Sequence, residues 1–279
     1  MTDGDQNTGG WFDGVDPGNV AGAAAAIRDG SAPETDDWPR LAVESGFAAD
    51  EAGYYRRLRE ATVRATREAV REAETADDKQ LIHAIRAMDD CERVANELAE
   101  RVAEWAGSQL DDAEAGVTYA RRLAEEEPED RRLRSLACRV RDLDDEVEEL
   151  RGHIERAAAE VAPNLTALAG AVLAARLVAL AGGLKELARK PAGTIQVLGA
   201  EEALFAHLRG RAPSPKHGVI FTHEAVSGTH PENRGSAARA LAGKLAIAAR
   251  IDHYSGDLRP ALEAELNDRI ERIQARDVE

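Results

Sequence analysis

The sequence is poor in aromatic residues, lysine and cysteine. Aromatic side chains make up only 4% of the 279 residues, although 43% of the residues are hydrophobic. Alanine dominates the apolar set, and alanine with leucine, arginine and glutamate favours long helices over a core of large aromatic rings. We therefore expect a mainly α-helical protein.

Metal sites and cofactor sites are not indicated. Cys91 and Cys138 are the only cysteines, and both fall at apolar positions of helical patterns, so we expect buried thiols. His217 and His223 are six residues apart with no cysteine nearby, which matches no compact zinc spacing. We expect neither a metal nor a cofactor.

Sequence motifs for catalysis are also missing. There is no glycine-rich phosphate loop, no dinucleotide-binding fingerprint, and no nucleophile elbow around Ser214, Ser227 or Ser236. The residues therefore give no reason to expect an enzyme, and no catalytic residue is predicted.

Targeting signals and membrane spans are weakly represented. The N-terminus lacks a basic stretch followed by an apolar one, so no secretion signal is predicted. Leu165–Leu184 is the one apolar run of sufficient length, but Arg176 lies at its middle, where a charge costs about 2.5–3.5 kcal/mol. We expect a tightly packed helix over 164–183 in a cytoplasmic protein that does not bind membranes.

Acidic residues outnumber basic ones by 52 to 36, which gives a net charge of −16. Surface carboxylates hold water and repel neighbouring molecules, so this balance is typical of proteins that stay soluble in concentrated salt. The composition favours a halophilic, archaeal source; an acidic bacterial protein encoded by GC-rich DNA is the alternative.

Two segments carry a regular apolar repeat with alternating spacings of three and four, which keeps one stripe facing a partner helix. The first is formed by Leu81, Ala84, Met88, Cys91, Ala95, Leu98, Val102 and Trp105, and the second by Leu133, Leu136, Val140, Leu143, Val147, Leu150, Ile154, Ala157 and Val161. Gly107, Gly116 and the acidic turn Glu125–Pro128 separate them. We expect a long antiparallel coiled-coil hairpin over 77–162, and the repeat alone leaves open whether it is a spacer or a dimerisation arm.

The segments before and after these two repeats do not continue the apolar spacing. Residues 1–20 are rich in Gly, Asp and Asn and are expected to lack stable structure or to be only loosely attached. Pro163 should end the second long helix. Thr194–Leu198 is expected to be extended, followed by Gly199 and another helix, and a last helix is expected at about 259–275.

Positive charge is concentrated in one segment. Leu204–Arg250 holds seven basic and two acidic residues, a balance of +5, so the rest of the chain carries −21. A basic island in an acidic protein is typical of contact with phosphates. The alternative is chance clustering with ion pairs to the acidic remainder.

Several long runs in this chain resemble one family. APNLTALAGAVLAARLVALAGGLKELARKPAGTIQVLGAEEALFAHLRGR, SPKHGVIFTHEAV and ENRGSAARALAGKLAIAARIDHY follow in order over 162–254. They resemble the Nop domain of archaeal box C/D guide-RNP scaffold proteins, of their nucleolar relatives and of a spliceosomal cousin. DDKQLIHAIRAMDDCERVANELAERVAEW looks like the start of that family's coiled coil. The resemblance implies a small truncated N-terminal region over 1–76, a coiled coil over 77–162 and an all-helical Nop domain over 163–279.

The resemblance also implies a function without catalysis by this chain. Such scaffolds dimerise through the coiled coil, for which the expected seam is Leu136, Val140, Leu143, Val147, Leu150 and Ile154. They bind a kink-turn in a box C/D guide RNA jointly with a small ribosomal-type kink-turn-binding protein. Their N-terminal domain holds fibrillarin, and the complex methylates a ribose 2′-oxygen of rRNA or tRNA. The competing readings are a spliceosomal-type scaffold and a coiled-coil interaction protein with no RNA role.

Candidate RNA-binding residues follow from the matching motifs. Lys216 would pair with a phosphate, and His217 would stack on a splayed base or cap a backbone group. Arg234 and Lys244 are expected to face RNA, whereas Arg239 and Arg250 are equally suited to ion pairs with acids such as Asp252. Arg211 and Gln196 complete the candidates, while Leu204, Phe205 and His223 are expected to be packed.

The chain departs from the family pattern at three places. Fewer residues than usual precede the coiled coil, which leaves fibrillarin binding with a reduced surface. Glu202 and Ser236 stand where lysines are common, which puts phosphate contacts at these two positions in doubt.

Overall fold

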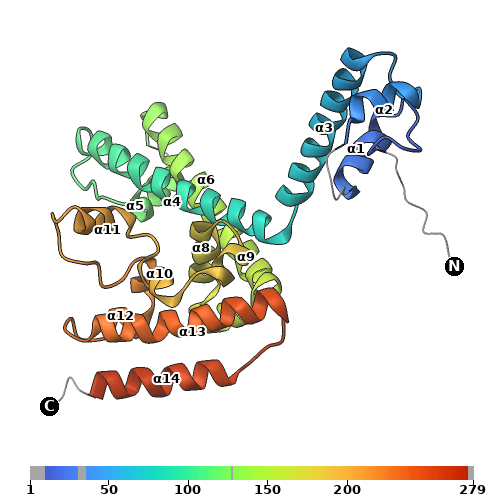
Figure 1. Cartoon of the computed structure of the whole chain (residues 1–279). Helices are drawn as coiled ribbons and strands as arrows, with labels where there is room; N and C mark the ends of the chain where they lie inside the picture. Colours follow the sequence, from blue (N-terminus) through green and yellow to red (C-terminus); the bar gives the residue numbers. More distant parts are fainter. Residues whose placement is uncertain (1–9, 31–35, 127, 276–279) are drawn as a thin grey trace. The chain divides into compact units, whose positions relative to one another are not determined.

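The computed structural model describes residues 10–30, 36–126 and 128–275. Within these ranges all regular secondary structure is helical and no strand occurs, which confirms the predicted mainly α fold class (Figure 1). The chain divides into two compact units, Met1–Ala76 and Asp77–Glu279.

The first unit contains α1 (Val20–Asp29), α2 (Trp38–Glu44) and α3 (Glu51–Glu74). Phe12, Phe47 and Tyr54 form its core, and the indole nitrogen of Trp11 donates to the Tyr54 hydroxyl at 3.1 Å. The expected lack of structure over 1–20 is therefore wrong for Trp11 and Phe12, because the two rings join this core. Residues 1–9 lie outside the described part of the chain.

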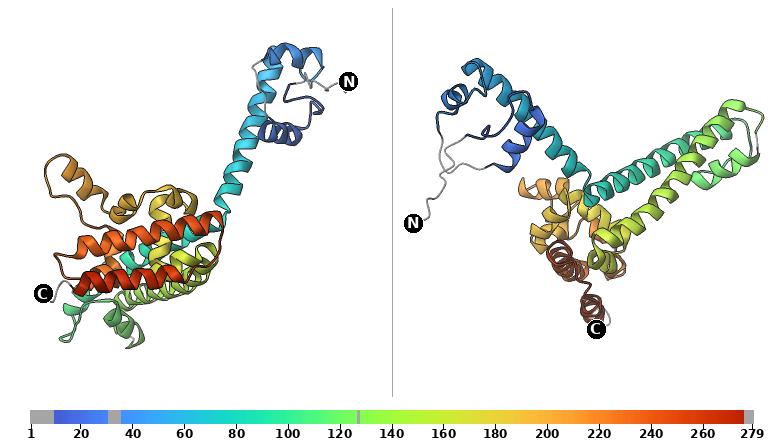
Figure 2. Two further views of the ribbon diagram at one scale, coloured as in Figure 1. Left: turned by 60° about the horizontal axis from the view of Figure 1, so that its bottom comes forward. Right: turned by 90° about the vertical axis from the view of Figure 1, so that its right-hand side faces the viewer.

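The second unit begins with a hairpin of two 31-residue helices, α4 (Asp77–Gly107) and α6 (Arg131–Val161). They run antiparallel along each other (Figure 2). The apolar repeats lie between them, and the fully or nearly fully buried members are Leu81, Met88, Ala95, Val102, Leu133, Val140, Val147 and Ile154. The 3–4 spacing thus reports the face along which the helices meet.

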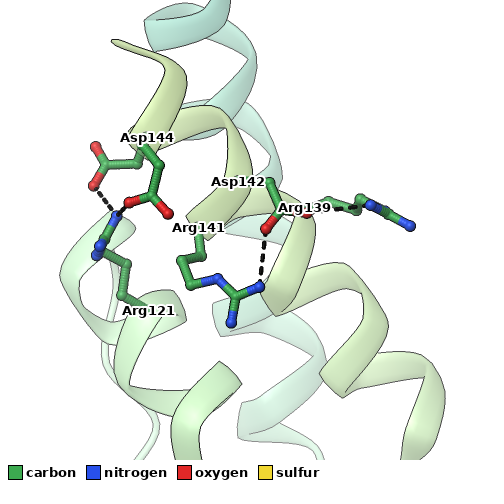
Figure 3. Close-up of polar contacts among 6 residues, drawn as sticks. Arg121, Arg139, Arg141, Asp142 and Asp144 are labelled. Atoms are coloured by element: carbon green, nitrogen blue, oxygen red, sulfur yellow. Dashed lines mark hydrogen bonds and ion pairs between the residues drawn. The ribbon is translucent and has the colours of Figure 1, made fainter. Parts of the chain in front are cut away.

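A short helix, α5 (Val117–Glu126), occupies the end of the hairpin where a turn was expected. Its Tyr119 and Leu123 pack against both long helices. Arg121 bridges to α6 with Nη1 at 2.7 Å from Asp144 and 2.6 Å from Asp145 (Figure 3). The expected turn at Glu125–Pro128 is wrong in part, since Glu125 and Glu126 continue this helix; Glu127 lies outside the described residues.

Nine further helical elements complete the described part of the second unit. They are α7 (Pro163–Ala169), α8 (Ala171–Ala181), α9 (Leu184–Arg189), α10 (Ala192–Val197), α11 (Glu201–Leu208), the 3₁₀ helix η1 (Val219–Thr222), α12 (Glu224–Ser227), α13 (Arg234–Tyr254) and α14 (Ala261–Gln274). Helix α13 is central, because α7, α9, α10, α12 and α14 all pack on it.

Two local expectations in this region are wrong. The helix expected over 164–183 is broken at Gly170, whose φ of 74° ends α7, and α7 and α8 are bent by 119°. The extended segment expected at Thr194–Leu198 is instead mostly α10, which starts directly after Pro191. Among the described residues no single helix has the length and apolar character to span a membrane; the bent pair α7 and α8 meets both criteria only jointly.

Buried polar groups hold α7 in place. Asn164 is 2% exposed, and its amide nitrogen donates to Asp252 at 2.6 Å and to the Asp257 carbonyl at 2.9 Å. The other Asp252 oxygen accepts from the Leu165 backbone at 2.9 Å. Asp252 therefore caps α7 and is not the ion-pair partner expected for Arg239 or Arg250.

Three polar contacts join the base of the hairpin to the following helices. Arg176 of α8 pairs with Asp89 of α4 at 2.5 Å. Asp78 accepts from the Leu184 backbone at 3.0 Å, and the Lys79 ammonium donates to the Gly182 carbonyl at 2.6 Å. The hairpin and the helices that follow it thus form one interlocked unit.

Candidate nucleic-acid interface

The loop that carries Lys216 and His217 is pinned to the end of α10. Gly218 donates its backbone N–H to the Gln196 carbonyl at 2.9 Å, and Val219 donates to the Leu198 carbonyl at 2.7 Å. The Gln196 side chain donates to the Lys216 carbonyl at 2.7 Å. Gln196, predicted to contact RNA, therefore positions the loop.

Glycine is required at position 218. A Cβ there would lie 1.9 Å from the Leu198 carbonyl oxygen, far inside any allowed contact. The absence of a side chain lets two backbone segments approach closely, as glycine commonly does in tight loops. Gly218 was not among the residues predicted from the sequence to form the interface.

A stack of three side chains follows the pinned loop. The His217 imidazole lies over the Phe221 ring at a centroid distance of 4.6 Å with 20° between planes. The Arg234 guanidinium carbon lies 5.3 Å from the centroid of the same ring. Arg234 is oriented by a hydrogen bond to the Thr229 carbonyl at 3.0 Å. Phe221 is 37% exposed, so this flat stack borders solvent.

Charge on this surface is positive. Lys216 is exposed and pairs with no acidic side chain in the described part of the chain, and its aliphatic stem runs beside Gly235. Burial, followed by the charges of Arg234 and Lys216, lowers the pKa of His217 below its usual 6.5. The imidazole is therefore favoured in its neutral form, and the two neighbouring cations supply the charge.

The remaining predicted cations lie elsewhere. Lys244, whose ammonium group was expected to face RNA, instead forms an ion pair with Glu265 of α14. Arg239 and Arg211 are exposed on α13 and after α11, respectively. Lys244 is ten residues beyond Arg234 on the same helix, a rise of about 15 Å. The structure thus brings Lys216, His217, Arg234 and Gln196 together, and it does not place Lys244 with them.

The apolar side chains of helix α11 are more exposed than the sequence predicts. Phe205 is 57% exposed and Leu208 is 71% exposed, and the helix has no buried residue. The predicted burial of Phe205 is wrong, because no described element covers that face of the helix. Leu204 is half-buried.

The other candidate residues have structural partners. His223 has Nε2 at 2.9 Å from the Leu168 carbonyl, and its Nδ1 accepts from the Ala225 N–H, which confirms that it is packed. Arg250 donates to the Ala188 carbonyl at 3.2 Å. Cys91 and Cys138 are free and only half-buried. No group of three or more potential ligand side chains in the described ranges is arranged to hold a metal.

The expected dimerisation seam is filled by the hairpin itself. Val140, Val147 and Ile154 are at most 4% exposed within the hairpin, opposite α4 of the same chain. Leu136, Leu143 and Leu150 are half-buried. A second copy would therefore have to contact the outer faces of the hairpin.

Comparison with known proteins identifies the family. A family model described as "Nop: snoRNA binding domain, fibrillarin" matches residues 67–273. An uncharacterized NOP5 family protein of Methanocaldococcus jannaschii is 43% identical over 182 residues, covering 65% of this chain and 40% of that protein. Nucleolar protein 58 of Scheffersomyces stipitis is 31% identical over 247 residues, covering 72% of this chain and 48% of that protein.

A solved structure agrees with these matches. A chain in the crystal structure of a fibrillarin/Nop5p complex aligns with a TM-score of 0.55 and 25% identity, covering 94% of this chain and 98% of that one. By contrast, the chain spans about half the length of the curated relatives it matches. The family model covers the hairpin, the pinned loop and the cation–aromatic stack, and the chain belongs to the Nop family.

Proposed function

We propose that this chain is a non-catalytic scaffold of a box C/D ribonucleoprotein that guides 2′-O-methylation of ribose in rRNA or tRNA. In this role it binds a kink-turn in the guide RNA and holds the methyltransferase near the target. One observation carries the proposal: the Lys216–His217–Phe221–Arg234 surface, in which Lys216 and Phe221 are exposed, lies inside the segment matched by the snoRNA-binding family model.

The chemistry of this surface suits RNA. Single-stranded RNA is recognised by stacking of splayed bases on aromatic rings and on arginine, together with phosphate contacts. Phe221 with His217 and Arg234 offers the stacking platform, and Lys216 offers the phosphate contact. The surface is small, so we expect weak binding of RNA by this chain alone.

A kink-turn-binding protein would supply the rest of the affinity. The exposed Phe205 and Leu208 on α11 offer an apolar surface for such a partner close in sequence to the pinned loop. If the source is halophilic, phosphate contacts contribute less, because binding falls by about 0.7 log units per phosphate for each tenfold rise in salt on single strands. Shape, stacking and the protein partner then dominate.

Fibrillarin is proposed as a further partner because a similar solved chain belongs to a fibrillarin/Nop5p complex. The first unit is the part of the chain that lies mostly outside the matched Nop segment, and it is the proposed docking region. Homodimerisation is proposed through the outer faces of the α4–α6 hairpin, since its inner seam is occupied.

Reconstitution tests the proposal. The chain is mixed with a box C/D kink-turn RNA and a kink-turn-binding protein, and assembly is followed by gel shift. Lys216→Ala should weaken assembly about tenfold, whereas Lys185→Ala, at another exposed and unpaired lysine, should not. Equal assembly by both variants would remove Lys216 from the interface, and no assembly by the natural chain would refute the RNA role.

A further inference from the structure

A groove of about 530 Å³ lies beside the pinned loop and is not used by the proposed surface. Helix α4 contributes Arg86 and Asp89, helix α8 contributes Arg176 and Leu180, and Gly199, Gly218 and Val219 also line the groove. Its volume falls within the range of about 300–1,000 Å³ found for sites that bind small molecules.

One part of the groove lining is apolar and is formed by Leu180, Gly199 and Val219. Leu180 is 45% exposed, and a Cβ on Gly199 would lie 3.3 Å from the Val219 Cβ and 3.5 Å from Leu180 Cδ1. Gly199, with a φ of 81°, therefore packs directly against these two side chains, and the three residues form one continuous apolar patch.

The backbone donors of Gly199, Gly218 and Val219 are already used. Gly199 donates to Glu201 at 2.9 Å, and the N–H groups of Gly218 and Val219 donate to the Gln196 and Leu198 carbonyls. An occupant would meet carbon surface and satisfied backbone there, which suits the face of a planar ring better than a group rich in hydroxyls.

The rim of the groove carries an uncompensated cation. Arg86 is exposed and has no acidic partner among the described residues, whereas Asp89, three residues further along α4, is neutralised by Arg176. The groove therefore joins an apolar patch to one guanidinium without an acidic partner, and apolar contact and positive charge are the features that recognise an unstacked base and its phosphate.

The groove is continuous with the candidate interface. Gly218 lines it and directly follows Lys216 and His217 in the pinned loop. RNA seated on the stack would have its neighbouring nucleotide close to this opening.

We propose that the groove between α4 and α8 binds one unpaired nucleotide of the RNA, with its phosphate on Arg86 and its base against Leu180, Gly199 and Val219. This inference rests on the proposed RNA-binding function. It extends the interface from the loop onto the base of the hairpin and makes α4 part of the RNA contact.

The test uses the complete complex of chain, kink-turn-binding protein and box C/D kink-turn RNA. Each unpaired uridine is replaced in turn by 4-thiouridine, and ultraviolet cross-links are mapped by mass spectrometry. One position should cross-link to the peptide that contains Leu180, which holds no residue of the Lys216–His217–Phe221–Arg234 surface. Leu180→Trp, which fills the groove from an exposed position, should abolish that cross-link while the unfolding midpoint is retained.

The salt dependence of assembly by the Arg86→Ala variant is a second measurement, and a purely structural role of Arg86 would not change it. Arg86→Ala should weaken assembly about fivefold and reduce the slope of log affinity against log salt by about 0.7, the value for one phosphate on a single strand. Arg156→Ala, at another exposed and unpaired arginine of the hairpin, should change neither quantity.

The outcomes separate the two claims. The groove proposal fails if no cross-link forms in the groove and Arg86→Ala leaves the salt slope unchanged. If Lys216→Ala still weakens assembly in that case, the proposed RNA-binding function stands. Absence of assembly by the natural chain overturns both.

Discussion

Replacing Gly218 with alanine should detach the loop that presents Lys216 and His217. The added Cβ would lie 1.9 Å from the Leu198 carbonyl oxygen and 2.7 Å from its carbonyl carbon. Both neighbours are backbone atoms, so no side-chain rotation relieves the clash. A separation of at least about 3.0 Å is needed, so the loop and the end of α10 must part by about 1.1 Å.

That displacement breaks the contacts that pin the loop. The Gly218–Gln196 bond at 2.9 Å would lengthen to about 4 Å, beyond hydrogen-bonding range. The Val219–Leu198 and Gln196–Lys216 bonds, both at 2.7 Å, depend on the same approach. Three bonds at about 0.5–1.5 kcal/mol each give a loss of about 1.5–4.5 kcal/mol.

Urea unfolding and amide hydrogen exchange measure this effect. Gly218→Ala should lower the free energy of unfolding or, if the loop opens locally, remove exchange protection at Val219. Gly193→Ala is the matched control: its Cβ meets nothing within 4 Å, and alanine in α10 should stabilise by about 0.5–1 kcal/mol. Gly218→Ala with unchanged stability and a protected Val219 amide would refute the reasoning.

Three further changes test other parts of the fold. Tyr119→Phe should stabilise the hairpin end by about 1 kcal/mol, because the buried Tyr119 hydroxyl has no hydrogen-bond partner among the described residues; a lower urea midpoint would contradict this. Asn164→Ala should cost about 3 kcal/mol in thermal unfolding, since the amide bonds to Asp252 and to two backbone groups; a loss below 1 kcal/mol would show that these bonds are replaced. Because the folded-state pKa of His217 is lowered, the contribution of this residue to stability is complete above about pH 6.5 and decreases as the pH falls. His217→Phe should therefore make the urea midpoint depend less on pH. An unchanged pH dependence would show that His217 is not the group that titrates.

The sequence predicted the long helices well because apolar periodicity reports helix pairing directly. The repeat through Leu81, Met88, Val140 and Ile154 lies on the buried face. The sequence did not predict α5, since the short segment between Gly116 and the acidic run that starts at Glu125 looks like a connection unless Tyr119 and Leu123 are known to pack against both long helices.

Local propensity was a poorer guide in the last third. The β-branched residues of Thr194–Leu198 favour an extended strand, but burial of Ile195 against α13 favours a helix there. Exposure of Phe205 was unpredictable because hydrophobicity alone does not show which face is left uncovered.

The basic island illustrates the same limit for charge. The charge count predicts a basic surface that includes Lys216, Arg234 and Lys244, but the Lys244–Glu265 pair joins residues 21 apart and depends on how α13 and α14 dock. The stacking of His217, Phe221 and Arg234 likewise depends on the loop geometry imposed by Gly218. Net charge indicates a region, whereas pairing decides which cations are free.

Purification of the tagged chain from its own cells tests the central claim most directly. Sequencing of bound RNA and mass spectrometry of bound protein should recover small RNAs with box C and box D motifs, a kink-turn-binding protein and fibrillarin. Recovery of the chain alone, free of RNA and of both proteins, would contradict its role as a ribonucleoprotein scaffold.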